Sequence, residues 1–321
     1  MISDVLNPIF GRLNFEFLRV LTKTNIMKNT LAFSITYLFA LLNLLGQENF
    51  SSNPLDAKFV TTDFDNFWKA LDQLEIVTGN PFEEYLEKAS PGLRPFREYL
   101  TPEEMLKSVQ QRKTDYLKCR TILADLPSYK KRIQAIYAAL KYWYADTTFP
   151  PVYFVVGVFS SGGTVSENGL LIGTELLEDL NSIDALIAHE LIHFQQTVEG
   201  PNTLLQQTLK EGTADFIGEL TSGILLNASL KEYGNAHESE LCKTFVKTMN
   251  TNNFGDWLYE RNTTDGKPKD MGYWIGYKIV EAYFNRQEDK KKAIQDILNI
   301  KDPVVFLKES GYLKRYLEGK E

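Results

Sequence analysis

The chain has 321 residues, of which 43% are hydrophobic and 24% charged, and its formal net charge is −7. This composition is that of an ordinary globular protein and argues against a wholly disordered chain or a polytopic membrane protein. An acidic chain binds nucleic acid poorly unless it carries a local basic stripe, and the lysine cluster at 290–292 directly follows two acidic residues. We therefore expect no nucleic-acid partner.

Residues 27–47 have the layout of a secretory signal peptide, with a short positive start, an apolar run over 31–45 and a polar segment after it. The run is short for a membrane span, which needs about 20 apolar residues, and no cysteine follows it. We expect a secreted or periplasmic protein without a stable membrane anchor after cleavage. A signal peptide begins near the translation start, so Met27 is the expected initiation site and 1–26 a mis-assigned upstream segment. The alternative is a buried or anchoring helix.

The mature chain is expected to begin with a polar linker over 48–60, followed by a single domain over 61–321. Apolar residues at helical spacing predict a first helix from Thr61, with Thr62 or Asp63 as its N-cap. The sequence then predicts helices over 101–119 and 128–144, a strand over 152–159, a flexible turn over 160–164 and a second strand over 170–173.

The remainder of the chain is expected to be helical. Glycine, proline and asparagine interrupt the helical pattern at 200–201, 234–235, 255, 265–268 and 311. The two cysteines, Cys119 and Cys242, are too few for a disulfide framework. Export would allow one bridge between them, or both could stay buried and free.

Two of the three histidines lie four residues apart in His189-Glu190-Leu191-Ile192-His193. An apolar stripe around them predicts a helix with Asn181 or Ser182 as its N-cap. Residues four apart lie one above the other on a helix, so both imidazoles can converge on one Zn²⁺. Glu190 projects to the side of the pair, where it can take a proton from a water that the metal activates.

Glu211 and Asp215 lie on a second predicted helix, over about 203–222. A catalytic zinc takes three protein ligands and keeps one position open. A turn after His193 allows an antiparallel return, which makes Glu211 the expected third ligand of one Zn²⁺ per chain. Asp215 shares the face of Glu211 and can accept the other ring N–H of a ligand histidine. Without the histidine motif, Glu211 and Asp215 would be interpreted as solvated surface carboxylates.

The pair His189-Glu190-x-x-His193 and Glu211-x-x-x-Asp215 resembles the gluzincin, or thermolysin-like, metallopeptidases. With Gly162-Gly163-Thr164-Val165 and Met271-Gly272-Tyr273-Trp274-Ile275-Gly276-Tyr277, the chain looks like a bacterial family of predicted zinc-dependent proteases. That family includes secreted members and relatives of gliding-motility lipoproteins. The resemblance covers roughly 60–315, and the lipid-anchor cysteine is missing. We expect an α+β, predominantly helical, zincin-like fold with a small sheet beside the active-site helix.

The resemblance also implies roles in substrate binding and catalysis. An edge strand before the motif helix binds the substrate backbone in this group, and Gly162, Gly163 and Thr164 match it here; an ordinary hairpin is the alternative. Candidate donors to the oxyanion that forms at the attacked carbonyl are His237, Tyr273 and Tyr277. Core packing is the alternative for each tyrosine, and a surface position for the histidine.

The sequence thus predicts a secreted zinc peptidase that acts on a peptide or protein substrate, with Glu190 as general base for a metal-activated water. Two other functions stay open. The first is a zinc hydrolase with a different substrate on the same site, because a fold does not fix its substrate. The second is a non-catalytic cell-envelope binding protein whose zinc is structural or absent.

Overall fold

The computed structural model describes residues 50–177, 183–255, 257–259 and 267–319. The expected signal peptide and the segment before it lie outside these residues, as do the expected N-caps Asn181 and Ser182. From Phe50 onward the described chain forms one unit. None of its described helices combines the length and the apolar character that a membrane crossing needs.

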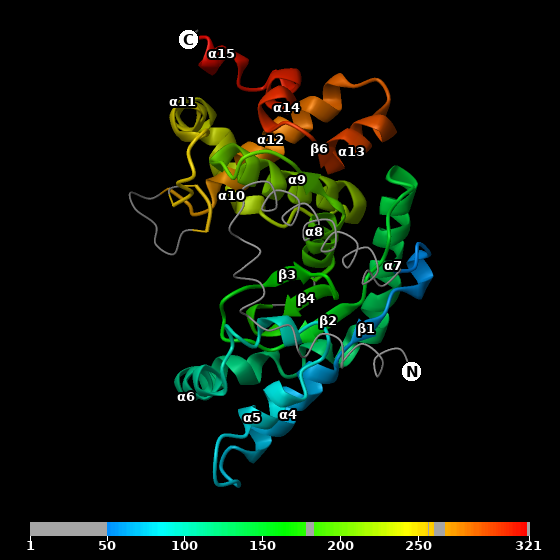
Figure 1. The fold of residues 1–321 in the computed structure, drawn as a ribbon, viewed down its shortest axis with the longest axis vertical. Coiled ribbons are helices and arrows are strands. Elements are labelled where there is room, and N and C mark those ends of the chain that lie inside the picture. Colours follow the sequence, from blue (N-terminus) through cyan, green and yellow to red (C-terminus); the bar gives the residue numbers. More distant parts are fainter. Residues whose placement is uncertain (1–49, 178–182, 256, 260–266, 320–321) are drawn as a thin grey trace, which may run out of the picture. The chain divides into compact units, whose positions relative to one another are not determined.

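A small mixed sheet forms one part of this unit (Figure 1). Its strand order is β1-β2-β4-β3, with β2 parallel to both β1 and β4, and β3 antiparallel to β4. The two central strands are buried along their whole length, as their apolar sequences require. The edge strand β3 is only half-buried. The strands are β1 (Phe59–Val60), β2 (Val152–Val155), β3 (Gly163–Ser166) and β4 (Gly169–Gly173).

The sheet corrects three details of the sequence analysis. The expected strand over 152–159 ends earlier, at Val155, and Phe159 has a φ of 60°, which no strand residue adopts. The expected turn over 160–164 is shorter, since Gly163 and Thr164 pair with β4. The expected linker over 48–60 is partly structured, since its last two residues, the apolar β1, satisfy their backbone on β2.

Four helices of the described chain precede the second strand. A capping box at Thr101 and Glu104 starts α6, as the sequence predicts. The expected N-cap of α4, Thr62 or Asp63, is wrong, because the helix begins at Thr62 and its N-cap is Thr61. Asp63 is buried instead and accepts a hydrogen bond from the Ser90 amide at 2.9 Å. These helices are α4 (Thr62–Gln73), α5 (Phe82–Glu87), α6 (Pro102–Cys119) and α7 (Leu126–Trp143), with the 3₁₀ turn η1 (Pro54–Asp56) before them and η2 (Arg94–Phe96) and η3 (Ile122–Asp125) between them.

The central helix α8 (Ile183–Gln195) lies between the sheet and two long helices, α9 (Leu204–Ser222) and α12 (Met271–Arg286) (Figure 1). Nearly every side chain of α8 from Ile183 to Ile192 is buried. The expected α+β, predominantly helical fold, with a small sheet beside the motif helix, is confirmed. A helix buried on all sides carries its polar residues into the interior, where they need polar partners.

The remaining helices lie around α9 and α12. The break expected at 234–235 falls inside α10, because Gly234 packs against the indole of Trp274 and the helix continues to Ala236. Gly311 ends α14 in the left-handed conformation, as expected. Cys119 and Cys242 are both buried and free. The elements are η4 (Thr174–Leu176), α10 (Ala228–Ala236), α11 (Glu238–Thr248), α13 (Lys290–Leu298), α14 (Pro303–Ser310), α15 (Lys314–Leu317) and a two-stranded parallel sheet of β5 (Thr197–Val198) and β6 (Asn299–Ile300).

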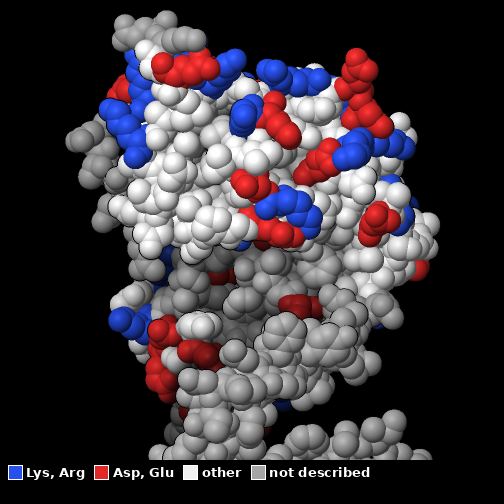
Figure 2. Space-filling view, turned by 45° about the horizontal axis from the view of Figure 1, so that its top comes forward, with Lys and Arg blue, Asp and Glu red and all other residues white. Residues whose placement is uncertain are grey.

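Charges of both signs are interspersed on the surface. On the described part of the face in Figure 2, lysine and arginine side chains stand beside aspartate and glutamate side chains. Exposed pairs such as Lys301 with Glu199 and Lys113 with Glu75 are of this kind. Such pairs contribute little to stability.

Two glycines let α9 and α12 approach each other closely. A Cβ atom added to Gly276 would lie 1.9 Å from the Thr208 carbonyl oxygen, and one added to Gly212 would lie 2.0 Å from the Gly276 carbonyl carbon. Both contacts are with backbone, which cannot move aside as a flexible side chain can. Gly212 directly follows Glu211, so this contact also fixes where that carboxylate stands.

We predict that Gly276→Ala lowers the free energy of unfolding by about 1–3 kcal/mol, because the added methyl group forces the two helices apart. Urea denaturation monitored by circular dichroism measures the change. Gly162→Ala is the matched control, since a Cβ there meets no atom within 4 Å. Equal stability of Gly276→Ala and wild type would contradict the close helix contact.

Candidate metal centre

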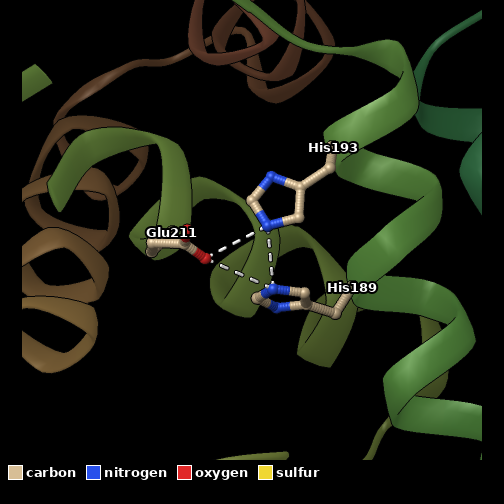
Figure 3. Close-up of side chains that lie close together, drawn as sticks. All are labelled: His189, His193 and Glu211. Atoms are coloured by element: carbon tan, nitrogen blue, oxygen red, sulfur yellow. Dashed lines mark hydrogen bonds and ion pairs between the residues drawn. The ribbon is translucent and has the colours of Figure 1, made fainter. Parts of the chain in front are cut away.

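Three side chains from two helices converge on one point (Figure 3). His189 and His193 project from successive turns of α8, and Glu211 reaches them from α9. The Nε2 atoms of the two histidines are 2.9 Å apart. Oε2 of Glu211 lies 3.1 Å from Nε2 of His193 and 3.5 Å from Nε2 of His189. The structure therefore brings together the three ligands expected from the sequence.

This arrangement fits a zinc ion. Zinc bonds of about 2.0–2.1 Å in a tetrahedral site separate ligand atoms by roughly 3.3 Å, close to the three spacings here. Two imidazoles and one carboxylate are a known ligand set of catalytic zinc sites. Within the described ranges, these residues form the one group of His, Cys, Asp or Glu side chains compact enough to hold a metal ion.

Asp215 orients the first histidine. Its Oδ1 lies 2.8 Å from Nδ1 of His189, and its Oδ2 accepts a hydrogen bond from the side-chain amide of Asn227 at 2.8 Å. A proton on Nδ1 leaves the lone pair of Nε2 pointing at the other ligands. Burial alone would lower the pKa of His189, but the carboxylates of Asp215 and Glu211 outweigh it and raise that pKa to about 10. The site therefore attracts positive charge.

Gln196 holds the second histidine. Its side-chain nitrogen lies 2.6 Å from Nδ1 of His193 and donates to the Lys210 carbonyl at 3.1 Å, so it links α8 to α9. The sequence analysis missed this residue. Its position three residues after His193, on the same helix face, was the available signal.

The carboxylate of Glu211 is 7% exposed and is held from several sides. Burial raises its pKa, but hydrogen bonds from His189 and His193 outweigh this and keep the pKa well below its usual range. The hydroxyl of Tyr259 donates to Oε1 at 2.7 Å. Tyr259 was also missed, because it lies in an irregular segment between two expected helix breaks, where no periodicity marks it.

Glu190 is buried beside the ligands, and no hydrogen bond to its carboxylate is found among the described side chains. It is 5% exposed, and burial raises the pKa of its carboxyl, against the opposing effect of the two histidines. The edge strand comes very close to it, since a Cβ atom on Gly163 would lie 2.4 Å from Oε1. A carboxylate with a raised pKa beside a cationic site is suited to accept a proton and to return it.

The other residues singled out from the sequence are placed as follows. Gly162 precedes β3, and Thr164 lies in it, paired with Leu171. Tyr273 stacks on His189 with ring centroids 6.1 Å apart, and burial together with the charge of Glu211 raises its pKa. The structure thus brings Tyr273 to the site.

Tyr277 and His237 are engaged elsewhere. The Tyr277 hydroxyl donates to Glu219 at 2.6 Å. His237 stacks on Tyr233 with ring centroids 4.0 Å apart, at the junction of α10 and α11. In the described part of the chain, no hydrogen bond or ring contact joins His237 to the three ligands. A spacing argument could not place this histidine, because its position depends on how α10 packs.

Residues 154–302 match the family described as "Predicted Zn-dependent protease (DUF2268)". The matched stretch runs from β2 to β6 and contains β3, α8, α9 and α12, and so every residue of the metal centre described above. None of the curated proteins compared with the chain matches it. The match supports a relationship to a zinc protease family that is itself defined by prediction.

We predict that Asp215→Ala weakens metal binding by roughly 10–100-fold, because the ring of His189 loses the partner that orients it. Competition with a chromogenic chelator measures the dissociation constant. Glu219→Ala, on the same helix but paired with Lys231, should leave the metal affinity unchanged. Unaltered affinity in Asp215→Ala would show that His189 needs no such orientation.

Proposed function

We propose that this protein is a secreted zinc-dependent peptidase of the gluzincin kind, in which His189, His193 and Glu211 hold one zinc ion per chain. The observation that carries the proposal is the convergence of these three ligand atoms beside the buried carboxylate of Glu190. The family match supports the metal and the peptidase class. The short positive start, apolar run and following polar segment of residues 27–47 support export.

A bound zinc ion would polarise the carbonyl of the scissile bond and lower the pKa of a nearby water. The chain supplies the proton transfers. Glu190 accepts the proton of the attacking water on its carboxylate and delivers it to the nitrogen of the leaving amine. Its raised pKa favours the first step, because a more basic carboxylate is the better proton acceptor, and the low solvent exposure of the site strengthens every charge interaction there.

The edge strand β3 supports a peptide as the substrate. Among the described strands, none pairs with its outer side, so its backbone can pair with an extended chain. Gly163 would bring that chain directly beside Glu190. The hydroxyls of Tyr273 and Tyr259 lie near Glu211 and are the candidate donors to the oxyanion.

The alternatives from the sequence remain distinguishable. A purely structural zinc site is closed by four protein ligands, whereas three are found in this cluster, and it has no use for a buried carboxylate beside it. A zinc hydrolase with another substrate would share the site but would not need an open strand edge. We therefore favour the peptidase.

We predict that Glu190→Gln keeps its zinc and loses at least ~10²-fold in turnover, because the amide cannot accept the proton. Glu211→Ala should lose both zinc and turnover. Elemental analysis gives the metal content, and mass spectrometry of a digested peptide library gives turnover. A Glu190→Gln variant as active as wild type would refute the mechanism. Zinc content near one without any peptide cleavage would favour a different hydrolase.

A further inference from the structure

A cavity lies close to the edge strand β3 and plays no part in the proposed proton transfers. It has a volume of about 130 Å³, and its walls are mostly apolar. Leu93, Phe96 and Leu100 line one side, and Val155 and Leu171 of the sheet line another. Gly163 and Thr164 of β3 also border it, which places its mouth beside the strand that we propose binds substrate.

The cavity lies on the face of the sheet that points away from α8. Successive residues of a strand face opposite sides. Gly163 faces Glu190 on α8, so Thr164 faces the other way, and so does Leu171, with which it pairs. An extended peptide paired with β3 would direct alternate side chains to the two faces. One side chain would point toward the metal centre and a neighbouring one toward the cavity.

A buried carboxylate borders this cavity. Glu175 is 7% exposed, and its Oε1 accepts a hydrogen bond from the Phe159 amide at 3.3 Å. Its Oε2 is buried and has no hydrogen-bond partner among the described residues. Two glycines that border the cavity make room for the carboxylate, since a Cβ atom would lie 2.8 Å from Oε1 at Gly157 and 3.4 Å from Oε2 at Gly173.

No cation of the described chain forms an ion pair with Glu175. The nearest candidate is Arg112, whose guanidinium lies over the ring of Phe159 at 3.5 Å from its centroid and pairs with Asp115. Burial raises the pKa of Glu175, against the lowering effect of the Gly157 and Phe159 amides. A buried acid with an unused oxygen is destabilising unless a donor reaches it.

We propose that this cavity is a specificity pocket that receives a lysine or arginine side chain of the substrate, with Glu175 as the group that pairs with the cationic end. The apolar walls suit the aliphatic stem of such a side chain. An apolar side chain of the same length would fill the walls but would leave the carboxylate unpaired. The proposal rests on the proposed function in one respect, the binding of an extended peptide along β3.

Peptide binding tests the pocket without relying on turnover. The test uses zinc-loaded Glu190→Gln protein and two fluorescent alanine-based nonapeptides that differ at the central residue, lysine in one and norleucine in the other. Fluorescence anisotropy gives both dissociation constants. We expect the lysine peptide to bind roughly tenfold more tightly, the size of effect that one hydrogen bond to a charged group produces.

Introducing Glu175→Gln into the Glu190→Gln protein should make its affinities for the lysine and norleucine peptides equal. The glutamine amide keeps the shape of the carboxylate and removes its charge. Glu98→Gln is the matched control. Glu98 is an exposed acid that lies between the lining residues Phe96 and Leu100 but does not itself border the cavity, so this variant should retain the preference for the lysine peptide. Val158→Phe narrows the pocket from its half-buried rim and should weaken the lysine peptide while metal content is unchanged. Thermal melting reports whether each variant is folded.

The outcomes separate this proposal from the proposed function. Equal affinity for the two peptides, no measurable binding of either, or a preference that survives Glu175→Gln would overturn the pocket. Digestion of the lysine peptide by the wild type is measured in parallel. A lysine preference that depends on Glu175, without any cleavage by the wild type, would support the pocket and reject the peptidase.

Discussion

The fold depends on finding partners for the polar and charged side chains of one helix, α8, that is buried on all sides. Nearly all of α8 is packed between the sheet, α7 and α9, and it carries His189 and Glu190 into that interior. Polar groups in such a place need partners. Asp215 and Glu211 of α9 supply them, so the same contacts hold two helices together and bring together the candidate ligands of a metal ion.

Close backbone contacts made by glycine determine the geometry around this cluster. Gly212 and Gly276 let α9 approach α12 until their backbones touch, which sets the position of Glu211. Gly163 lets the edge strand approach Glu190 in the same way. In each case a methyl group would have to occupy space already held by another group. The metal ligands, the acid and the strand are therefore positioned by rigid elements rather than by loops.

The roles of three buried glutamates differ because their carboxylates have different partners. Glu211 is held by two histidines and a tyrosine, and its pKa is low, as suits a permanently ionised ligand. Glu190 lies next to the same histidines but has a raised pKa, as suits a group that gains and loses a proton. Glu175 is on the opposite face of the sheet with an unpaired oxygen, and a ligand is the partner we infer for it.

The sequence by itself determined the mostly helical class, the helices that carry the candidate metal ligands and the three side chains that converge there. These features follow from local periodicity and from the pairing of residues four apart on a helix. The tertiary structure alone decided that Tyr259 and Gln196 touch the ligands, that His237 packs on Tyr233 instead, and that β2 ends at Val155. It also decided that Glu175 lies behind the edge strand. These facts depend on contacts between segments distant in sequence, which no local pattern encodes.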